Sequence, residues 1–118
     1  MAKQLIVLTT TGRRSHEPRS VKVYAFDDGE AGLVVVASKG GFATDPAWAD
    51  NLRADPRATV AIGKRTMAVQ AREVDDADHG RLWALVTEAF KNYEYYQRKT
   101  KRRIPLFMLE PVEGAPSA

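Results

Sequence analysis

A lysine and two glycines follow a short apolar run, in the order Ser38-Lys39-Gly40-Gly41. Glycine has no Cβ, so its backbone N–H groups can come close to a ligand and adopt positive φ without strain. Lys39 adds a positive charge, and Trp48 follows closely enough for its indole to lie against the same ligand. These residues indicate an anion site. The alternative is an ordinary corner between a strand and a helix with Trp48 in the core, because the motif is weaker than G-x-x-x-x-G-K-[ST].

A second basic segment lies earlier in the chain, where Gly12-Arg13-Arg14-Ser15 is followed by Arg19. Guanidinium groups bind phosphate and carboxylate through two parallel hydrogen bonds, so three arginines around a glycine loop could hold such a group. The alternative is a basic loop that only contacts solvent.

Two tyrosines, Tyr93 and Tyr96, are three residues apart in a segment that could be helical. At that spacing both phenols lie on one side of a helix and could line one pocket. Tyrosines so placed are also found in cores and interfaces with a satisfied hydroxyl. The basic run at 98–103 fits a solvated helix end, where cations suit the helix dipole. It is a weak indication of nucleic-acid binding, because the aromatic residues precede it and do not alternate with it.

Alternating or continuous apolar residues predict six β-strands. The predicted strands are residues 4–10, 19–26, 32–38, 57–62, 66–74 and 104–109. The segment 27–30 is typical of a hairpin turn.

Three further segments, 46–54, 77–90 and 92–100, predict helices. Asp45 is expected to cap the first, with Pro46 in its first turn. Apolar residues at helical spacing predict the core-facing side of the second. They are Leu82, Leu85, Val86, Ala89 and Phe90. Because strands in hairpins and helices occur without a βαβ repeat, the order predicts an α+β fold, a six-stranded antiparallel barrel with flanking helices.

The chain has 118 residues, and its hydrophobic content of 44% is enough for one core. We expect a single domain over 1–112 and a loose tail at 113–118. The formal charge is +3, and there is no cysteine, which fits a reducing cytoplasm. The two histidines have no spacing that suggests a metal site. The sequence shows neither a charged leader nor a long apolar segment, so we expect neither export nor a membrane span.

Three motifs occur in order along the chain and together carry more information than each alone. They are L-T-T-T-G-R-R-S-x-x-P-R at 8–19, A-S-K-G-G at 37–41 with P-A-W-x-x-N-L at 46–52, and Y-x-x-Y-Q with T-x-R-x-I-P at 93–105. They resemble the deazaflavin-dependent nitroreductase family over nearly the whole chain. The resemblance implies a split β-barrel of the flavin-reductase, FMN-binding-like type that holds coenzyme F420, an 8-hydroxy-5-deazaflavin.

The same resemblance implies which residues hold the cofactor. Arg13, Arg14 and Arg19 match positions that bind its phosphate and glutamate tail. Lys39 lies close to the cofactor, and Trp48 matches the tryptophan beside the ring system. The full set implied is Gly12, Arg13, Arg14, Ser15, Pro18, Arg19, Ser38, Lys39, Gly40, Gly41, Trp48 and Asn51.

By the same likeness, Ser38, Tyr93 and Tyr96 match positions near the reacting face, where family members bind substrate. The expected activity is hydride transfer from the reduced deazaflavin to an electron-poor small molecule such as a quinone, an enone or a nitroaromatic. Tyr93 or Tyr96 could donate a proton or orient the acceptor, with Ser38 assisting. The cofactor carries the reaction, and the protein supplies orientation and charge.

Two positions depart from the family pattern. His16 stands where glycine usually follows R-R-S, which bears on the loop geometry. Ala49 stands where an aromatic residue often follows the tryptophan, which bears on the pocket wall. The chain also begins without the N-terminal helix of longer relatives, and this predicts a more open pocket or a different substrate.

Other functions remain open at this point. The same barrel could hold flavin mononucleotide, whose phosphate suits the same arginines, and act as a flavin-dependent reductase. It could also be a binding module without turnover, either a cofactor carrier or a basic nucleic-acid binder, of which we expect the nucleic-acid binder least. Barrels of this kind often pair as homodimers.

Overall fold

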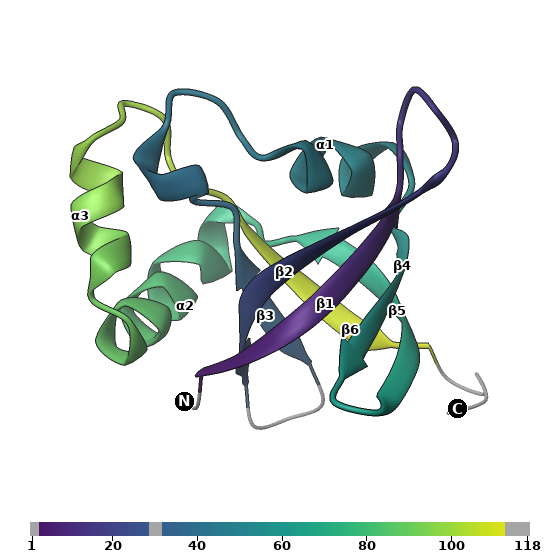
Figure 1. The fold of residues 1–118 in the computed structure, drawn as a ribbon. Coiled ribbons are helices and arrows are strands. Elements are labelled where there is room, and N and C mark those ends of the chain that lie inside the picture. The colour runs from purple at the N-terminus through teal and green to yellow at the C-terminus, as the bar shows by residue number, and fades with distance from the viewer. Residues whose placement is uncertain (1–2, 29–31, 113–118) are drawn as a thin grey trace.

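Six antiparallel strands close into a barrel in the order β1-β2-β3-β6-β5-β4 (Figure 1). The structure is a computed structural model that describes residues 3–28 and 32–112. The strands are β1 (Lys3–Thr11), β2 (Pro18–Asp27), β3 (Leu33–Val36), β4 (Arg57–Ile62), β5 (Arg65–Glu73) and β6 (Leu106–Pro111). The prediction of a six-stranded antiparallel barrel is confirmed.

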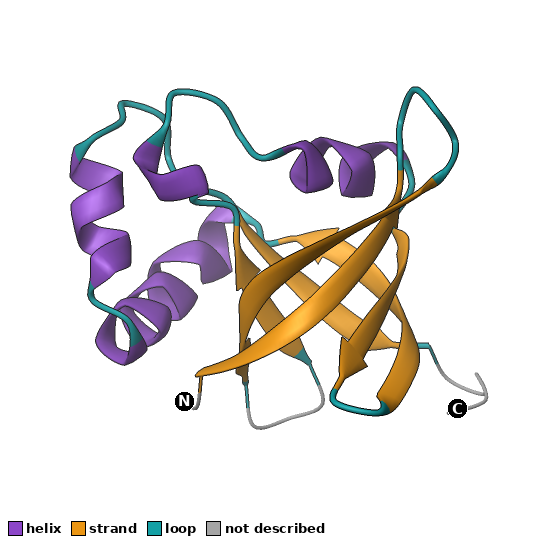
Figure 2. Ribbon diagram, viewed as in Figure 1, coloured by secondary structure: helices purple, strands orange, loops and turns teal. Residues whose placement is uncertain are grey.

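The helices lie outside the barrel wall (Figure 2). They are the short 3-10 helix η1 (Lys39–Gly41) and the α-helices α1 (Ala47–Ala54), α2 (Asp76–Ala89) and α3 (Asn92–Arg98). Among the described residues, no helix has the length and apolar character needed to cross a membrane. The flanking helices of the predicted α+β fold are therefore present.

The predicted strand and helix bounds agree with the structure to within about two residues. The third strand ends at Val36 rather than at 38. The Ala37 N–H still donates to the Pro105 carbonyl (2.9 Å), but Pro105 has no N–H to return a hydrogen bond, and the chain then turns into η1. The last strand runs from Leu106 to Pro111 rather than over 104–109. Part of the predicted turn at 27–30 and the whole predicted tail at 113–118 lie outside the described residues.

Strand β3 is buried on both faces, and this explains its continuous apolar run. Leu33 and Val35 belong to the cluster inside the barrel, whereas Val34 and Val36 pack outside it under α2 and α3. Strand β6, its neighbour in the barrel, divides in the same way. A strand covered on both sides reads as unbroken hydrophobic sequence instead of alternating.

Helix α1 covers one end of the barrel, the end at which the loop between β1 and β2 projects (Figure 1). Trp48, Ala49 and Leu52 of this helix join the interior cluster. The Trp48 ring meets Phe107 of β6 edge to face, with centroids 5.8 Å apart. Burial of these side chains fixes α1 against the barrel, and with it the segment that leads into the helix.

Helices α2 and α3 cover a second apolar cluster against the outer face of β3 and β6. Asp75 caps α2 by accepting a hydrogen bond from the Asp78 N–H (3.1 Å). The predicted core-facing stripe of α2 is right at Leu82 and Val86 but wrong at Leu85, which is 38% exposed. The buried face is rotated toward His79, whose ring contacts the Ile104 carbonyl oxygen at 2.9 Å.

Candidate active site

A cavity of about 660 Å³ lies between the β1–β2 loop, the segment that begins at Lys39, and α1. Its lining residues come from three separate parts of the sequence. They are Thr10, Gly12, Arg13, Arg14, Ser15, Arg19, Ser20, Val21, Lys39, Pro46, Ala47, Trp48 and Asn51. The two basic segments that the sequence indicated separately therefore face one space. Among the predicted cofactor residues, Pro18, Ser38, Gly40 and Gly41 do not line it.

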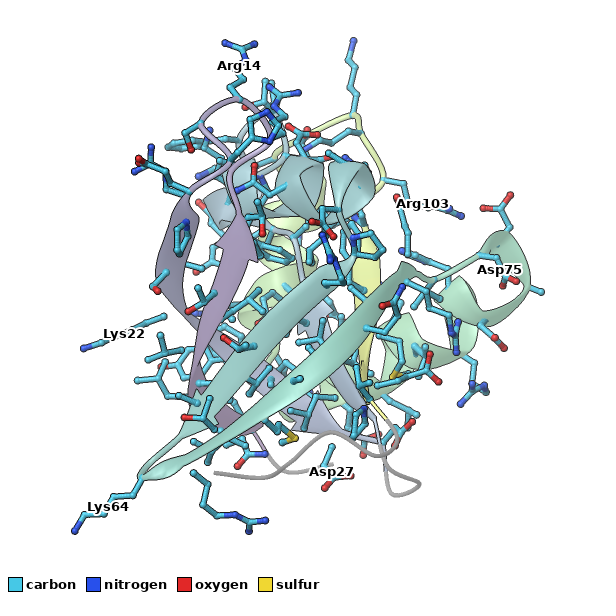
Figure 3. The ribbon with its side chains drawn as sticks, turned by 90° about the vertical axis from the view of Figure 1, so that its right-hand side faces the viewer. Arg14, Lys22, Asp27, Lys64, Asp75 and Arg103 are labelled. Carbon is cyan, nitrogen blue, oxygen red and sulfur yellow. The ribbon has the colours of Figure 1, made fainter. Side chains whose placement is uncertain are left out.

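Four cations line this cavity, and no carboxylate does so among the described residues. Arg13, Arg14 and Arg19 come from the β1–β2 loop and the start of β2, and Figure 3 shows Arg14 projecting from that loop. Within the described part of the chain, none of the four forms an ion pair; the Lys39 ammonium donates only to the Thr44 hydroxyl (3.3 Å). Unneutralised cations around one hollow create a positive potential that attracts an anionic ligand.

The N-terminus of α1 faces the same cavity. Its N-cap residue Pro46 and its first two residues, Ala47 and Trp48, all line the cavity. The predicted cap by Asp45 is wrong: Pro46 occupies the N-cap position, and no side chain caps the helix. The Asp45 carboxylate is used elsewhere, by Arg53 and Arg102, each at 2.7 Å. The uncapped N–H groups and the positive end of the helix dipole therefore remain available to an anion.

Asn51 connects α1 to the arginine loop. Its buried side-chain amide donates to the Thr10 hydroxyl (3.0 Å), and its carbonyl oxygen accepts from the backbone N–H of Arg13 (3.1 Å). One side chain thus satisfies a buried hydroxyl and fixes the backbone at the first cavity arginine. The sequence placed Asn51 in the site only through the family motif; its positioning role depends on the approach of α1 to β1.

The arginine loop keeps a tight shape with a histidine at its tip. The Gly12 N–H donates to the Glu17 carbonyl and the His16 N–H donates to the Gly12 carbonyl, both at 2.8 Å. His16 has a φ of 59°, in the left-handed region that favours glycine. This conformation suits the glycine that the resemblance led us to expect at this position, and His16 adopts it at some cost in strain. Ala49, the other departure, is fully buried inside the barrel and does not line the cavity.

A sequence model of the F420H(2)-dependent quinone reductase family matches residues 1–111. The chain is 39% identical over 107 residues to an F420H(2)-dependent quinone reductase of Mycobacterium tuberculosis (strain H37Rv), covering 88% of this chain and 71% of that protein. The chain belongs to the F420H(2)-dependent quinone reductase family. The predicted resemblance to a deazaflavin-dependent family is confirmed, although the matching description names quinones and not nitro compounds.

Two solved structures resemble this member of the quinone reductase family closely. One is described as an F420-H2 dependent reductase, with a TM-score of 0.80, 34% identity, and coverage of 90% of this chain and 93% of that one. The other is described as a domain-swapped dimer, with a TM-score of 0.81, 34% identity, and coverage of 90% and 79%. The split-barrel fold expected from the family motifs is therefore confirmed.

The residues of the cavity fit the cofactor of the F420H(2)-dependent quinone reductase family. F420 carries a phosphate and a glutamate tail, both anionic. Four cations without ion pairs, an uncapped helix N-terminus and a lining without carboxylates suit such a ligand. Trp48 adds an aromatic surface whose ring is held in place by Phe107. None of these features depends on the family match.

The Lys39–Gly41 segment of this family member takes an unusual backbone path. Lys39, Gly40 and Gly41 have φ values of 45°, 62° and 84°. A Cβ on Gly41 would lie 2.6 Å from the backbone oxygen of Tyr96, so glycine is required there for packing against α3. A Cβ on Gly40 would meet nothing within 4 Å, so only its backbone conformation favours glycine. The predicted closeness of both glycines to the cofactor stays a prediction.

None of the three residues predicted near the reacting face, Ser38, Tyr93 and Tyr96, is among the residues that line the cavity. Tyr93 is 5% exposed and packs against Phe90 (ring centroids 4.9 Å apart) and against Tyr96 (6.2 Å). Burial, followed by the neighbouring tyrosines, raises the pKa of the Tyr93 phenol above its usual range. Tyr96 is partly buried on the same side of α3. The structure brings the pair together, as their spacing indicated.

Arg102 is the residue whose importance the sequence analysis missed. The basic run at 98–103 was expected to be a solvated helix end, but the Arg102 side chain is only 16% exposed. Its guanidinium donates to the carbonyl oxygens of Ser38 and Phe42, which flank the Lys39–Gly41 segment. The T-x-R-x-I-P motif already contained Arg102 and set it apart from the rest of the basic run. Spacing in the sequence could not show which groups this arginine contacts. Its partner Asp45 also binds Arg53, whose pKa is raised above its usual range chiefly by hydrogen bonds to Glu73.

Proposed function

We propose that this chain is an oxidoreductase that binds F420 in the cationic cavity and uses its reduced form to reduce a quinone. The observation that carries the proposal is the cavity itself, in which four cations without ion pairs and the uncapped N-terminus of α1 face one space beside Trp48. When bound, reduced F420 supplies a hydride to an electron-poor acceptor. The chain supplies binding, orientation and charge.

The anionic part of the cofactor is held by Arg13, Arg14, Arg19 and Lys39, which provide charge-assisted hydrogen bonds to phosphate and carboxylate. Trp48 orients the ring system. Its indole has little freedom, because Trp48 is only 7% exposed and meets Phe107 edge to face. An aromatic wall fixed in this way lowers the entropic cost of ordering the ligand.

Of the residues predicted near the reacting face, we assign the acceptor contacts to Ser38 and Tyr96. Ser38 adjoins Lys39 of the cavity, and Tyr96 lies on the side of α3 that contacts η1. Tyr93 is the weaker proton donor, because burial raises the pKa of its phenol and keeps the proton bound. Its ring supports Tyr96 instead.

Family membership favours F420 over flavin mononucleotide, and a quinone over an enone or a nitroaromatic. The flavin-dependent reductase and the cofactor carrier without turnover are outcomes that the experiment below would reveal. The cytoplasmic location predicted from the lack of cysteine stays a prediction.

We also propose that two copies of the chain form a homodimer. The support is the similar solved structure described as a domain-swapped dimer and the exposure of two large apolar side chains on the outer barrel wall. These are Leu5 of β1 and Tyr24 of β2, which are paired in the β1–β2 register.

The test is a fluorescence titration of purified protein with F420 and, separately, with flavin mononucleotide. Replacing Arg13 and Lys39 together by alanine should weaken F420 binding by about 10²-fold or more, because each lost charge-assisted hydrogen bond contributes about 1.5–3 kcal/mol. The matched control replaces Lys64 and Arg65 by alanine. These exposed cations lie at the β4–β5 turn, at the opposite end of the barrel from Arg14 (Figure 3). Equal affinity of the wild type and the Arg13/Lys39 variant would contradict the assigned site.

Turnover is measured as the oxidation of reduced F420 by a small naphthoquinone. Tyr96→Phe should bind F420 normally and reduce the quinone about 10²-fold more slowly, because a positioned acid contributes about 10²- to 10⁴-fold. The same rate in Tyr96→Phe and wild type would show that Tyr96 has no such role. F420 binding without oxidation by any quinone, enone or nitroaromatic would favour the carrier.

A further inference from the structure

The guanidinium of Arg102 holds the segment from 37 to 45 by four hydrogen bonds. It donates to the carbonyl oxygens of Ala37 (3.2 Å), Ser38 (2.8 Å) and Phe42 (2.9 Å) and to the Asp45 carboxylate (2.7 Å). Lysine could not reproduce this pattern, because the planar fork of arginine presents five fixed donors. One side chain therefore determines where three backbone carbonyl groups of this segment point.

Arg102 is itself held in place by its own segment. The Gln97 side chain donates to the backbone oxygen of Arg102 (2.7 Å) and accepts from the Ile104 N–H (2.9 Å). The Thr100 hydroxyl accepts from the Arg102 N–H (3.3 Å). Lys99 adds a weaker contact to the carbonyl of Gly40 (3.4 Å). The motif residues that follow Tyr96 thus form a preorganised support for one guanidinium.

The orientation of the peptide units follows from these contacts. In a trans peptide the C=O and the next residue's N–H point in opposite directions, and the described residues contain no cis bond. The carbonyls of Ala37 and Ser38 point toward Arg102, so the N–H groups of Ser38 and Lys39 point away from it. Within the described part of the chain, neither N–H donates a hydrogen bond to another group. Lys39 itself lines the cavity.

We propose that Arg102 is a positioning residue of the cofactor site, which holds the Lys39 ammonium and the N–H groups of Ser38 and Lys39 toward the bound anion without touching it. The inference rests on the proposed function, because the anion is the phosphate or carboxylate part of F420. Arg102 does not line the cavity, so its effect on affinity passes through the segment. Asp45 neutralises Arg102 and ties the segment to Arg53 of α1.

The first measurement is hydrogen exchange of the cofactor-free protein. Arg102→Ala should raise the exchange of the hydrogen-bonded amides in 37–45, those of Ala37, Gly41 and Phe42, by about tenfold or more, because the segment loses its bonds to a charged donor, and should leave the barrel strands unchanged. Arg103→Ala is the matched control. Arg103 is the next residue, its side chain is 55% exposed, and it pairs with Asp76 of α2 instead of the segment. Unchanged exchange in 37–45 of Arg102→Ala overturns the proposal.

The second measurement is the F420 dissociation constant. Arg102→Ala should raise it about tenfold. Because Arg102 acts through Lys39, combining Arg102→Ala with Lys39→Ala should cost less than the product of the two single losses. A role in overall stability alone would give independent, multiplying losses, and that result overturns the proposal. Wild-type affinity in Arg102→Ala also overturns it and leaves the proposed function intact. Failure of the wild type to bind F420 defeats both.

Arg102→Lys covers the case in which the alanine variant does not fold. It keeps the charge but cannot reach three carbonyls, so exchange in 37–45 and the F420 dissociation constant should both still rise. A lysine variant with wild-type exchange and wild-type affinity contradicts the proposal.

Discussion

Single residues in this site act mainly by holding backbone in place. Asn51 binds the Thr10 hydroxyl and the Arg13 N–H, and Arg102 gathers three carbonyl groups. The cations that face the cavity are exposed and mobile by nature, so their affinity for a ligand depends on how firmly their backbone is fixed. His16 shows the complementary case, in which a loop shape is kept although its residue is not the glycine that the φ of 59° favours.

The contribution of Asn51 can be measured by replacing it with leucine, which has a similar size. The Thr10 hydroxyl and the Arg13 N–H would then lose their partner next to a buried side chain, at a cost of about 1–3 kcal/mol in the free energy of unfolding. Chemical denaturation checks this, with Gln70→Leu on the exposed face of β5 as the control. A transition at the wild-type denaturant concentration in Asn51→Leu would count against the role given to its amide.

At the scale of elements, strands β3 and β6 are covered on both faces, and α3 packs its tyrosines against that outer layer. Tyr93 lies among Phe26, Phe90 and Tyr96. Helix α3 thereby forms the support on which η1 rests, since Gly41 meets the backbone of Tyr96. The same helix that would carry the acceptor contacts thus also supports the Lys39 segment.

The buried phenol of Tyr93 predicts a specific dependence of stability on pH. Burial raises its pKa in the folded state above the ordinary value of 10.0, so the folded protein holds this proton more tightly than the unfolded chain. The associated stability is present below about pH 10 and is lost as the pH rises further. Tyr93→Phe should therefore lose less stability than wild type as the pH rises above about 10, measured by denaturation at each pH. Tyr95→Phe, at a tyrosine that is 55% exposed, should behave like wild type.

At the scale of the whole molecule, the two ends of the barrel differ. The cationic cavity lies at the end that α1 covers, whereas the β4–β5 turn with Lys64 lies at the other (Figure 3). The wall between them presents Leu5 beside Tyr24 on its outer surface, and Lys3 lies over the Tyr24 ring (4.4 Å). Neither Leu5 nor Tyr24 is among the residues that line the cavity.

The homodimer proposal is tested by analytical ultracentrifugation over a range of protein concentrations. We expect a mass of twice the 13.1 kDa of one chain at micromolar concentration, because two paired barrels would cover the exposed Leu5 and Tyr24. Leu5→Lys should shift the equilibrium toward the monomer while F420 affinity per chain stays the same. A wild type that sediments as a monomer throughout would refute the proposal.

The sequence alone determined the features that depend on local pattern. Alternation and helical spacing predicted the six strands and three helices, and the glycine, arginine and lysine segments indicated an anion site. These signals are readable because neighbouring residues share one face of a strand or helix. The family motifs added the identity of the cofactor, which no spacing argument could supply.

The tertiary structure decided what each side chain meets. Asp45 looked like a helix cap, yet it pairs with Arg102, which is 57 positions away in the sequence. Gly41 looked like a site for ligand approach, yet it is required by the backbone of α3. Partners of this kind are set by the register of β3 against β6 and by the packing of α3 on the barrel. The pattern of residues along the sequence shows which face of a helix or strand is apolar. It does not show which polar group from a distant part of the sequence will contact that helix or strand.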